Sequence, residues 1–125
     1  MGKSRRRASS RLGTEEALRL AEESLLSGQM EAAIECLDAV LAADQGNLAA
    51  YPLLLRALDS VPAQSGQTDR RPALWNNYGN ALQSVGHYLE AERAYRQSLL
   101  LAPAYVHPWS NLSNVLRLLG RIADA

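Results

Sequence analysis

Apolar and small residues recur every three to four positions along most of this chain, which is the spacing of one face of an α-helix. The pattern is clearest at Trp75, Gly79 and Leu82, which stand at positions i, i+4 and i+7. Gly86 interrupts it where a left-handed residue would end a helix, and the apolar face restarts at Tyr88. We therefore predict two antiparallel helices joined at this glycine, with the apolar face of each helix buried.

The predicted helix pair spans residues 72–105, because Pro103 closes its second helix. Gly79 and Ala91 are small enough to let the two backbones approach closely, while the bulky Tyr95 fills the space beside them. The sequence therefore predicts a close helix contact in which small side chains face large ones.

The same segment recurs 34 positions later in the chain. The matched residues are Trp75 and Trp109, Asn77 and Asn111, Gly79 and Ser113, Leu82 and Leu116, Gly86 and Gly120, Tyr88 and Ile122, and Ala91 and Ala125. A repeat of this length predicts a solenoid of stacked helix pairs. Residues 106–125 then hold a helix that ends at Gly120 and a second helix cut short. A solenoid normally ends in a capping helix, so we expect this chain to be a fragment truncated at its C-terminus.

A weaker copy covers residues 14–47, with Gly28 in the place of Gly86 at an offset of 58 positions. Thr14 is predicted to cap its first helix. The aromatic positions are lost in this copy, as is common in a terminal repeat whose outer face meets water.

Residues 48–71 remain between the two copies and are too few for a whole repeat. We predict a half repeat there, with one helix over residues 48–58 and a loop over residues 59–71. Pro52 cannot donate a backbone hydrogen bond, so it is expected to shift the regular part of that helix downstream or to kink it.

Residues 72–105 closely resemble the tetratricopeptide repeat family. The resemblance lies in the order of their Trp, Gly, Gly-x-Tyr, Ala, Tyr and Pro residues. Ser98 departs from the family's usual Ala and adds a hydroxyl that needs a partner. The resemblance implies an all-α fold, a right-handed α-solenoid of antiparallel helix pairs. It also implies a protein-interaction module whose concave surface binds an extended peptide or a partner helix.

Charge changes this picture only at the N-terminus. Thirteen basic and thirteen acidic residues cancel, so the whole chain offers no field that favours nucleic acid or a membrane. Residues 1–13 hold five basic residues, no acid and no hydrophobic periodicity, and we predict a disordered basic tail there. Contact of this tail with nucleic acid or anionic lipid is one interpretation, and a solvated leader is the other.

Cysteine content and hydropathy bear on the cellular compartment. Cys36 is the only cysteine, which excludes an intramolecular disulfide and favours a cytoplasmic location. No apolar run is long enough for a transmembrane segment.

Asparagines recur on the side that the apolar faces leave open. Asn77 and Asn80 lie opposite Trp75 at helical spacing, and Asn111 and Asn114 repeat both positions in the next copy. Amides both donate and accept hydrogen bonds, which suits pairing with the backbone of an extended peptide. Ordinary polar residues on a solvated face are the alternative interpretation.

The family resemblance implies that these asparagines line the concave surface, together with Asn76 and Arg117. The arrangement is similar to the asparagine ladder of the O-linked N-acetylglucosamine transferases. This similarity implies a second hypothesis, in which the chain is the N-terminal substrate-presenting arm of a larger glycosyltransferase whose catalytic part is absent here. Other families of the class clamp a terminal carboxylate with Lys and Arg at concave positions. Here those positions carry Ala73, Asn76, Gln83, His107 and Ser110, so no such clamp is expected.

No catalytic, cofactor or metal site is predicted. His87 and His107 lack a second Cys, or a His or Glu at ligand spacing, beside them. We also find no phosphate-binding loop and no activated nucleophile. We therefore expect no enzymatic activity, no cofactor and no small-molecule substrate for this chain. A third hypothesis is self-association, in which the last helix buries Leu112, Leu116 and Leu119 against another copy.

Overall fold

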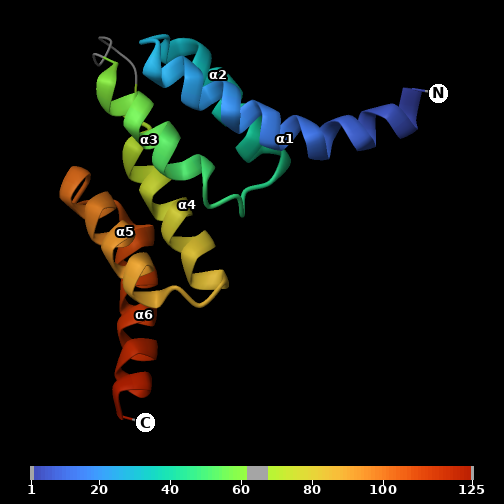
Figure 1. The fold of residues 1–125 in the computed structure, drawn as a ribbon. Helices are drawn as coiled ribbons and strands as arrows, with labels where there is room; N and C mark the ends of the chain where they lie inside the picture. The colour runs from blue at the N-terminus through green and yellow to red at the C-terminus, as the bar shows by residue number, and fades with distance from the viewer. Residues whose placement is uncertain (1, 62–67, 125) are drawn as a thin grey trace. The chain divides into compact units, whose positions relative to one another are not determined.

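The chain is built from α-helices. A computed structural model describes the backbone of residues 2–61 and 68–124 and the side chains of residues 13–61 and 68–120. The helices are α1 (Gly2–Leu26), α2 (Met30–Ala43), α3 (Ala50–Ser60), α4 (Arg71–Ser84), α5 (Tyr88–Leu101) and α6 (Val106–Asp124) (Figure 1). No strand occurs within these described ranges, so the predicted all-α fold of helix pairs is confirmed.

Two compact units divide the chain, an N-terminal unit over Met1–Pro62 and a C-terminal unit over Ala63–Ala125. Each unit consists of one helix pair followed by the first helix of a further pair. In the N-terminal unit α1 packs against α2, and α3 packs mainly against α2. In the C-terminal unit α4 packs against α5, and α6 contacts both of them.

Glycine makes the turn between the helices of each pair. Gly28 has φ +80° and Gly86 has φ +86°, the only positive φ angles among the described residues. The two turns also share a hydrogen-bond pattern, in which Gln29 N donates to Ser24 O at 2.8 Å and His87 N donates to Leu82 O at 2.9 Å. A left-handed backbone conformation is unfavourable for a residue with a side chain but not for glycine. These glycines therefore end the helices as predicted.

The close approach of α4 and α5 depends on Gly79. Tyr95 of α5 is fully buried, and a Cβ atom on Gly79 would lie 2.5 to 2.8 Å from three atoms of its ring. Nearby, the buried Ser98 hydroxyl donates to the carbonyl of Pro72 at 2.7 Å. The predicted pairing of small and large side chains is present, and the hydroxyl that departs from the family pattern has a partner.

The last helix differs from the prediction. α6 continues through Gly120 to Asp124, whereas the repeat pattern predicts a turn at this glycine. Gly120 has no positive φ, and a side chain at this position would meet nothing within 4 Å. A glycine inside a helix costs only about 0.5–1 kcal/mol, so a glycine alone does not force a turn. At Gly28 and Gly86 the following helix packs back on the preceding one, and that packing stabilises the turn.

The first helix also differs, because α1 begins at Gly2 and includes Thr14 in its interior. The sequence pattern predicts a disordered tail over residues 1–13 and a helix cap at Thr14. Arg, Ala and Leu are good helix formers, and extending an existing helix avoids the cost of a new nucleus. The backbone of residues 2–13 therefore continues the helix that packs against α2.

The helix predicted over residues 48–58 corresponds to α3. α3 begins two residues later than expected, at Ala50, and the side chain of Asn47 accepts from the backbone N–H groups of Ala49 and Ala50 at 3.1 and 3.2 Å. Pro52 falls in the first turn, where its missing N–H is harmless. Residues 62–67 of the predicted loop lie outside the described residues.

Candidate partner-binding site

Helices α4 and α6 carry the five asparagines that the sequence singles out. On α4, Asn76 is buried with 5% of its surface exposed, while Asn77 and Asn80 are exposed. On α6, Asn111 and Asn114 are half-buried. A polar side chain as buried as Asn76 requires a hydrogen-bond partner inside the unit.

Asn111 provides that partner and joins α6 to α4. Its Nδ2 donates to Oδ1 of Asn76 at 2.9 Å and to Oδ1 of Asn80 at 3.1 Å. Both hydrogens of the Asn111 amide are therefore used inside the unit. Its oxygen accepts no hydrogen bond from the described residues. The packing of α6 on α4 thus contains a polar contact between residues that are more than thirty positions apart in the sequence.

Tyr95 brings α5 into the same set of hydrogen bonds. Its hydroxyl lies 2.7 Å from Oδ1 of Asn80 and 3.0 Å from Oε1 of Gln83, and these two oxygens share its single proton. Burial raises the pKa of Tyr95 from 10.0 to about 12, so the folded protein favours the neutral hydroxyl. We call Asn76, Asn80, Gln83, Tyr95 and Asn111 the amide network.

Two of the predicted asparagines make no hydrogen bond to the amide network. Asn77 is exposed and forms no hydrogen bond with the described residues. Asn114 accepts a hydrogen bond from Arg117, so this cation is engaged on its own helix. The hydrogen bonds of Asn111 therefore go to Asn76 and Asn80 and not to Asn77, its counterpart in the repeat.

The sequence pattern misses the role of Tyr95 and Gln83. It predicts Tyr95 only as a side chain that fills space beside Gly79. A buried tyrosine hydroxyl generally finds a hydrogen-bond partner, and this rule was the signal that a polar neighbour should exist. It could not identify the neighbour, because Asn80 and Gln83 lie on a different helix from Tyr95.

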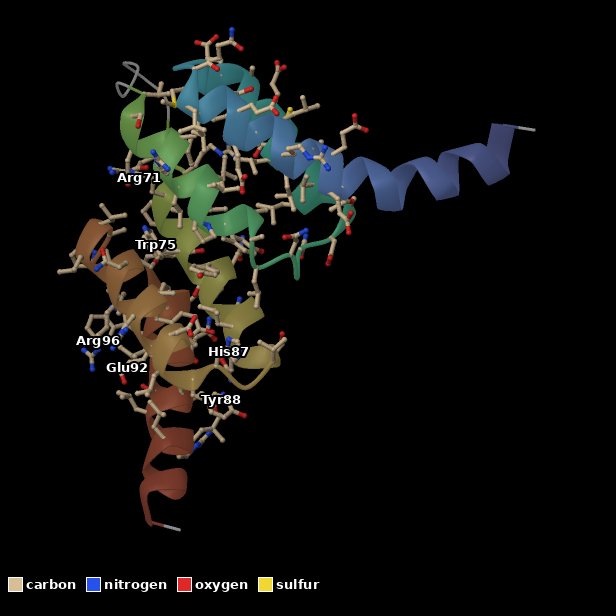
Figure 2. All side chains as sticks on the ribbon, in the orientation of Figure 1. Arg71, Trp75, His87, Tyr88, Glu92 and Arg96 are labelled. Atoms are coloured by element: carbon tan, nitrogen blue, oxygen red, sulfur yellow. The ribbon has the colours of Figure 1, made fainter. Side chains whose placement is uncertain are left out.

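A groove separate from the amide network lies between α4 and α5. It has a volume of about 260 Å³ and is lined by Trp75, Tyr78, Leu82, Glu90, Arg93, Ala94 and Gln97. The rings of Trp75 and Tyr78 lie 6.1 Å apart at 42°. Burial, followed by the negative charge of Glu90, raises the pKa of Tyr78. Trp75, labelled on α4 in Figure 2, is only half-buried, so the prediction that its apolar face is enclosed holds for Gly79 and Leu82 but not for Trp75.

The histidines form no recognisable reactive site. His87 is exposed at the turn between α4 and α5, as Figure 2 shows, and His107 meets the ring of Tyr105 edge-on at 5.6 Å. Within residues 13–61 and 68–120, no group of three His, Cys, Asp or Glu side chains could hold a metal ion. The described helices also include none that is long and apolar enough to cross a membrane.

The surface proposed for self-association is smaller than the sequence predicts. Leu112 is 5% exposed because it packs inside the C-terminal unit, so its inclusion is wrong. Leu119 is half-buried and Leu116 is 41% exposed. Trp109, at 53% exposed, is tied to the preceding loop by a hydrogen bond from Nε1 to the carbonyl of Pro103 at 2.9 Å.

Comparison with known proteins gives one family match and several structural matches. Residues 72–105 match the family model described as tetratricopeptide repeat. No curated protein sequence matches the chain. The first tetratricopeptide (TPR) domain of Spaghetti (RPAP3) bound to the HSP90 peptide SRMEEVD is 15% identical, with a TM-score of 0.41, over 87% of this chain and 94% of that one. The NMR structure of the first TPR domain of human RPAP3 is 15% identical, with a TM-score of 0.43, over 90% of this chain and 96% of that one.

At these TM-scores the structural likeness gives no basis for assigning that peptide to this chain. The family match coincides with the predicted repeat over residues 72–105. These matches give no support to the resemblance to the glycosyltransferase arm.

Proposed function

Because residues 72–105 form a tetratricopeptide repeat, we propose that this chain is a protein-interaction module that binds an extended peptide on α4 and α6 of its C-terminal unit. The amide network is the observation that supports this proposal. Asn80 and Asn111 touch each other near the surface, and each keeps one half of its amide unpaired among the described residues. Asn77, one turn before Asn80 on α4, adds an amide that makes no hydrogen bond to the side chains and backbone that the structure describes.

The basic side chains on this part of α4 and α6 already have partners, which bears on the kind of peptide. On α4, Arg71 is paired with Asp69 at 2.8 Å, and on α6 Arg117 donates to Asn114. Recognition would then depend on backbone N–H and C=O groups, with little contribution from a terminal carboxylate. We expect a selected peptide to bind equally well with a free or an amidated C-terminus.

Peptide selection tests the proposal directly. Peptides selected on the full chain from a random dodecapeptide library would be measured by isothermal titration calorimetry against the wild type and variants. The double variant Asn77→Ala with Asn80→Ala is expected to weaken binding by about tenfold or more, as two hydrogen bonds are lost. Circular dichroism should be unchanged, because Tyr95 keeps Gln83 and Asn111 keeps Asn76 as partners when Asn80 is removed.

Gln97→Ala is the matched control, since it removes an exposed amide from the groove between α4 and α5. It is expected to leave the affinity unchanged. A library that gives no binder, or binders that respond to Gln97→Ala and not to the asparagine variant, would contradict the proposed site.

A further inference from the structure

The unpaired halves of Asn80 and Asn111 have opposite polarity. Asn80 turns its oxygen inward, where it accepts from Tyr95 and from Asn111, and its Nδ2 has no acceptor among the described residues. Asn111 turns its nitrogen inward, and no described residue donates to its Oδ1. The pair therefore offers one donor and one acceptor, which is the complement of the C=O and N–H that every residue of an extended backbone carries.

This polarity requires that something fixes which way the Asn80 amide faces. The two ends of an amide are nearly equal in size, so its orientation depends on its hydrogen-bond partners. Asn111 is one partner, but its own orientation depends on the oxygens that it contacts. Tyr95 is the partner whose position is set independently, because its ring is fully buried against Gly79.

The hydrogen bonds of the Tyr95 hydroxyl are also restricted. The acceptors that it contacts are the oxygens of Asn80 and Gln83. The hydroxyl has one proton, and its shorter contact, 2.7 Å against 3.0 Å, is with Asn80. A proton directed at Asn80 favours an oxygen on the inner side of that amide over the NH2 group. The donor is present at neutral pH, because both the ordinary tyrosine pKa of 10.0 and the raised pKa of about 12 lie well above that pH.

We propose that Tyr95 is a positioning residue, whose hydroxyl holds the Asn80 amide with its nitrogen outward so that Asn80 and Asn111 together select the backbone of an extended peptide. The inference rests on the proposed function and deepens it, because it names the group that orients the site. Tyr95 itself is buried and would not touch the peptide.

A double-mutant cycle tests this inference with a dodecapeptide selected as above. Tyr95→Phe keeps the ring against Gly79 and removes only the donor, so binding should weaken by about three- to tenfold, the effect of one hydrogen bond. Asn80→Ala should weaken binding at least as much. The variant carrying both changes should bind like Asn80→Ala alone, since Tyr95 acts only through Asn80.

A merely structural role gives a different result. If Tyr95→Phe weakened binding through general loosening of the unit, its effect would persist in the Asn80→Ala background, and the inference would be overturned. An unchanged affinity of Tyr95→Phe would overturn it as well. If Asn80→Ala itself had no effect, the proposed function would fail first, so the two failures are distinguishable.

Asn80→Asp provides a second route that leaves Tyr95 in place. An aspartate keeps an inward oxygen for Tyr95 and Asn111 but replaces the outward donor with an acceptor. We expect this variant to fold like the wild type and to lose binding at least as strongly as Asn80→Ala. Binding at wild-type strength would show that Asn80 does not present a donor to the peptide.

Discussion

The two units share one arrangement of turn glycines and buried positions, which we call the frame. They differ in the polarity of the side chains at matching positions. At an offset of 58 residues, Gly28 and Gly86 make the same turn, with φ angles of +80° and +86°. Buried positions also correspond across the two units. The corresponding buried residues are Ala21 and Gly79, Ala33 and Ala91, Leu37 and Tyr95, Val40 and Ser98, Leu54 and Leu112, and Ala57 and Val115. The frame therefore depends on turn glycines and on the spacing of buried positions more than on the particular side chains.

The side chains at matching positions differ in polarity. In the N-terminal unit, Leu18, Glu22 and Leu53 stand where the C-terminal unit has Asn76, Asn80 and Asn111. The amide network is therefore an addition to the frame, and nothing in the N-terminal unit corresponds to it at those positions. This difference is the reason to place the proposed peptide site on the C-terminal unit.

The two units also place different pairs of side chains at matching positions of their first two helices. Ala21 and Leu37 occupy the positions that Gly79 and Tyr95 occupy in the C-terminal unit. A larger ring on one helix is accommodated by a smaller residue on the other, which keeps the space filled. The comparison predicts that exchanging one member of a pair without the other is costly.

The largest expected effect follows from Gly79→Ala. The new Cβ would lie within 2.8 Å of the Tyr95 ring, and we expect overpacking to lower the free energy of unfolding by about 2 kcal/mol. Both tryptophans, Trp75 and Trp109, lie in the C-terminal unit, so urea unfolding followed by tryptophan fluorescence reports on that unit.

Adding Tyr95→Leu to Gly79→Ala recreates the Ala21 and Leu37 pair and should recover part of the loss. Ala21→Gly is the matched change in the N-terminal unit and should cost about 1 kcal/mol, measured by circular dichroism. A neutral or stabilising Gly79→Ala would show that the ring moves freely and would contradict the packing comparison.

The next effect is a loss of stability at high pH that depends on Tyr95. The folded-state pKa of about 12 lies above the ordinary 10.0, so the folded state favours the neutral hydroxyl. Its contribution to stability is complete below pH 10 and is lost as the pH rises through 12. Unfolding followed by tryptophan fluorescence between pH 8 and 12 should show this fall, and Tyr95→Phe should reduce it. An identical pH profile for the two proteins would rule out this contribution.

A smaller effect is expected at the turns. Gly28→Ala and Gly86→Ala each place a side chain at positive φ, which should cost about 1–2 kcal/mol in either unit. No neighbouring atom stands within 4 Å of either new Cβ, so the cost is conformational and should be similar in the two units. Thermal unfolding of both variants measures it, and a large difference between them would break the equivalence of the two turns.

The smallest effect, and the one of opposite sign, is expected at Gly120. Because this glycine lies within α6 without a positive φ, Gly120→Ala should stabilise the C-terminal unit by up to about 1 kcal/mol. Urea unfolding followed by tryptophan fluorescence measures the change. Destabilisation similar to that of Gly86→Ala would instead favour the turn that the repeat pattern predicts.

Much of the fold could be predicted from the sequence, because its determinants are local. The helical period, the turn glycines at positions 28 and 86 and the closing Pro103 act through residues within about four positions of one another. The same local signals failed at Gly120 and at residues 2–13. A glycine tolerates both a turn and a helix, and residues 2–13 have enough helix propensity to extend α1.

The candidate site was only partly predictable, since periodicity found the asparagines but not their partners. It placed Asn77 and Asn80 on one side of α4, and both are exposed. It did not reveal that Asn111 pairs with Asn80, or that Tyr95 is the donor behind them. Which amides meet depends on how α6 is rotated and displaced against α4.

The sequence by itself determined the turns at Gly28 and Gly86 and the facing of Gly79 by Tyr95, because those choices follow from backbone sterics and helical spacing. The tertiary structure decided which polar groups meet, including Ser98 with Pro72 and Asn111 with Asn76. These contacts join residues 26 and 35 positions apart. Hydrogen bonds require partners within about 3 Å and in line, and only the packing of the helices brings such distant groups to that separation.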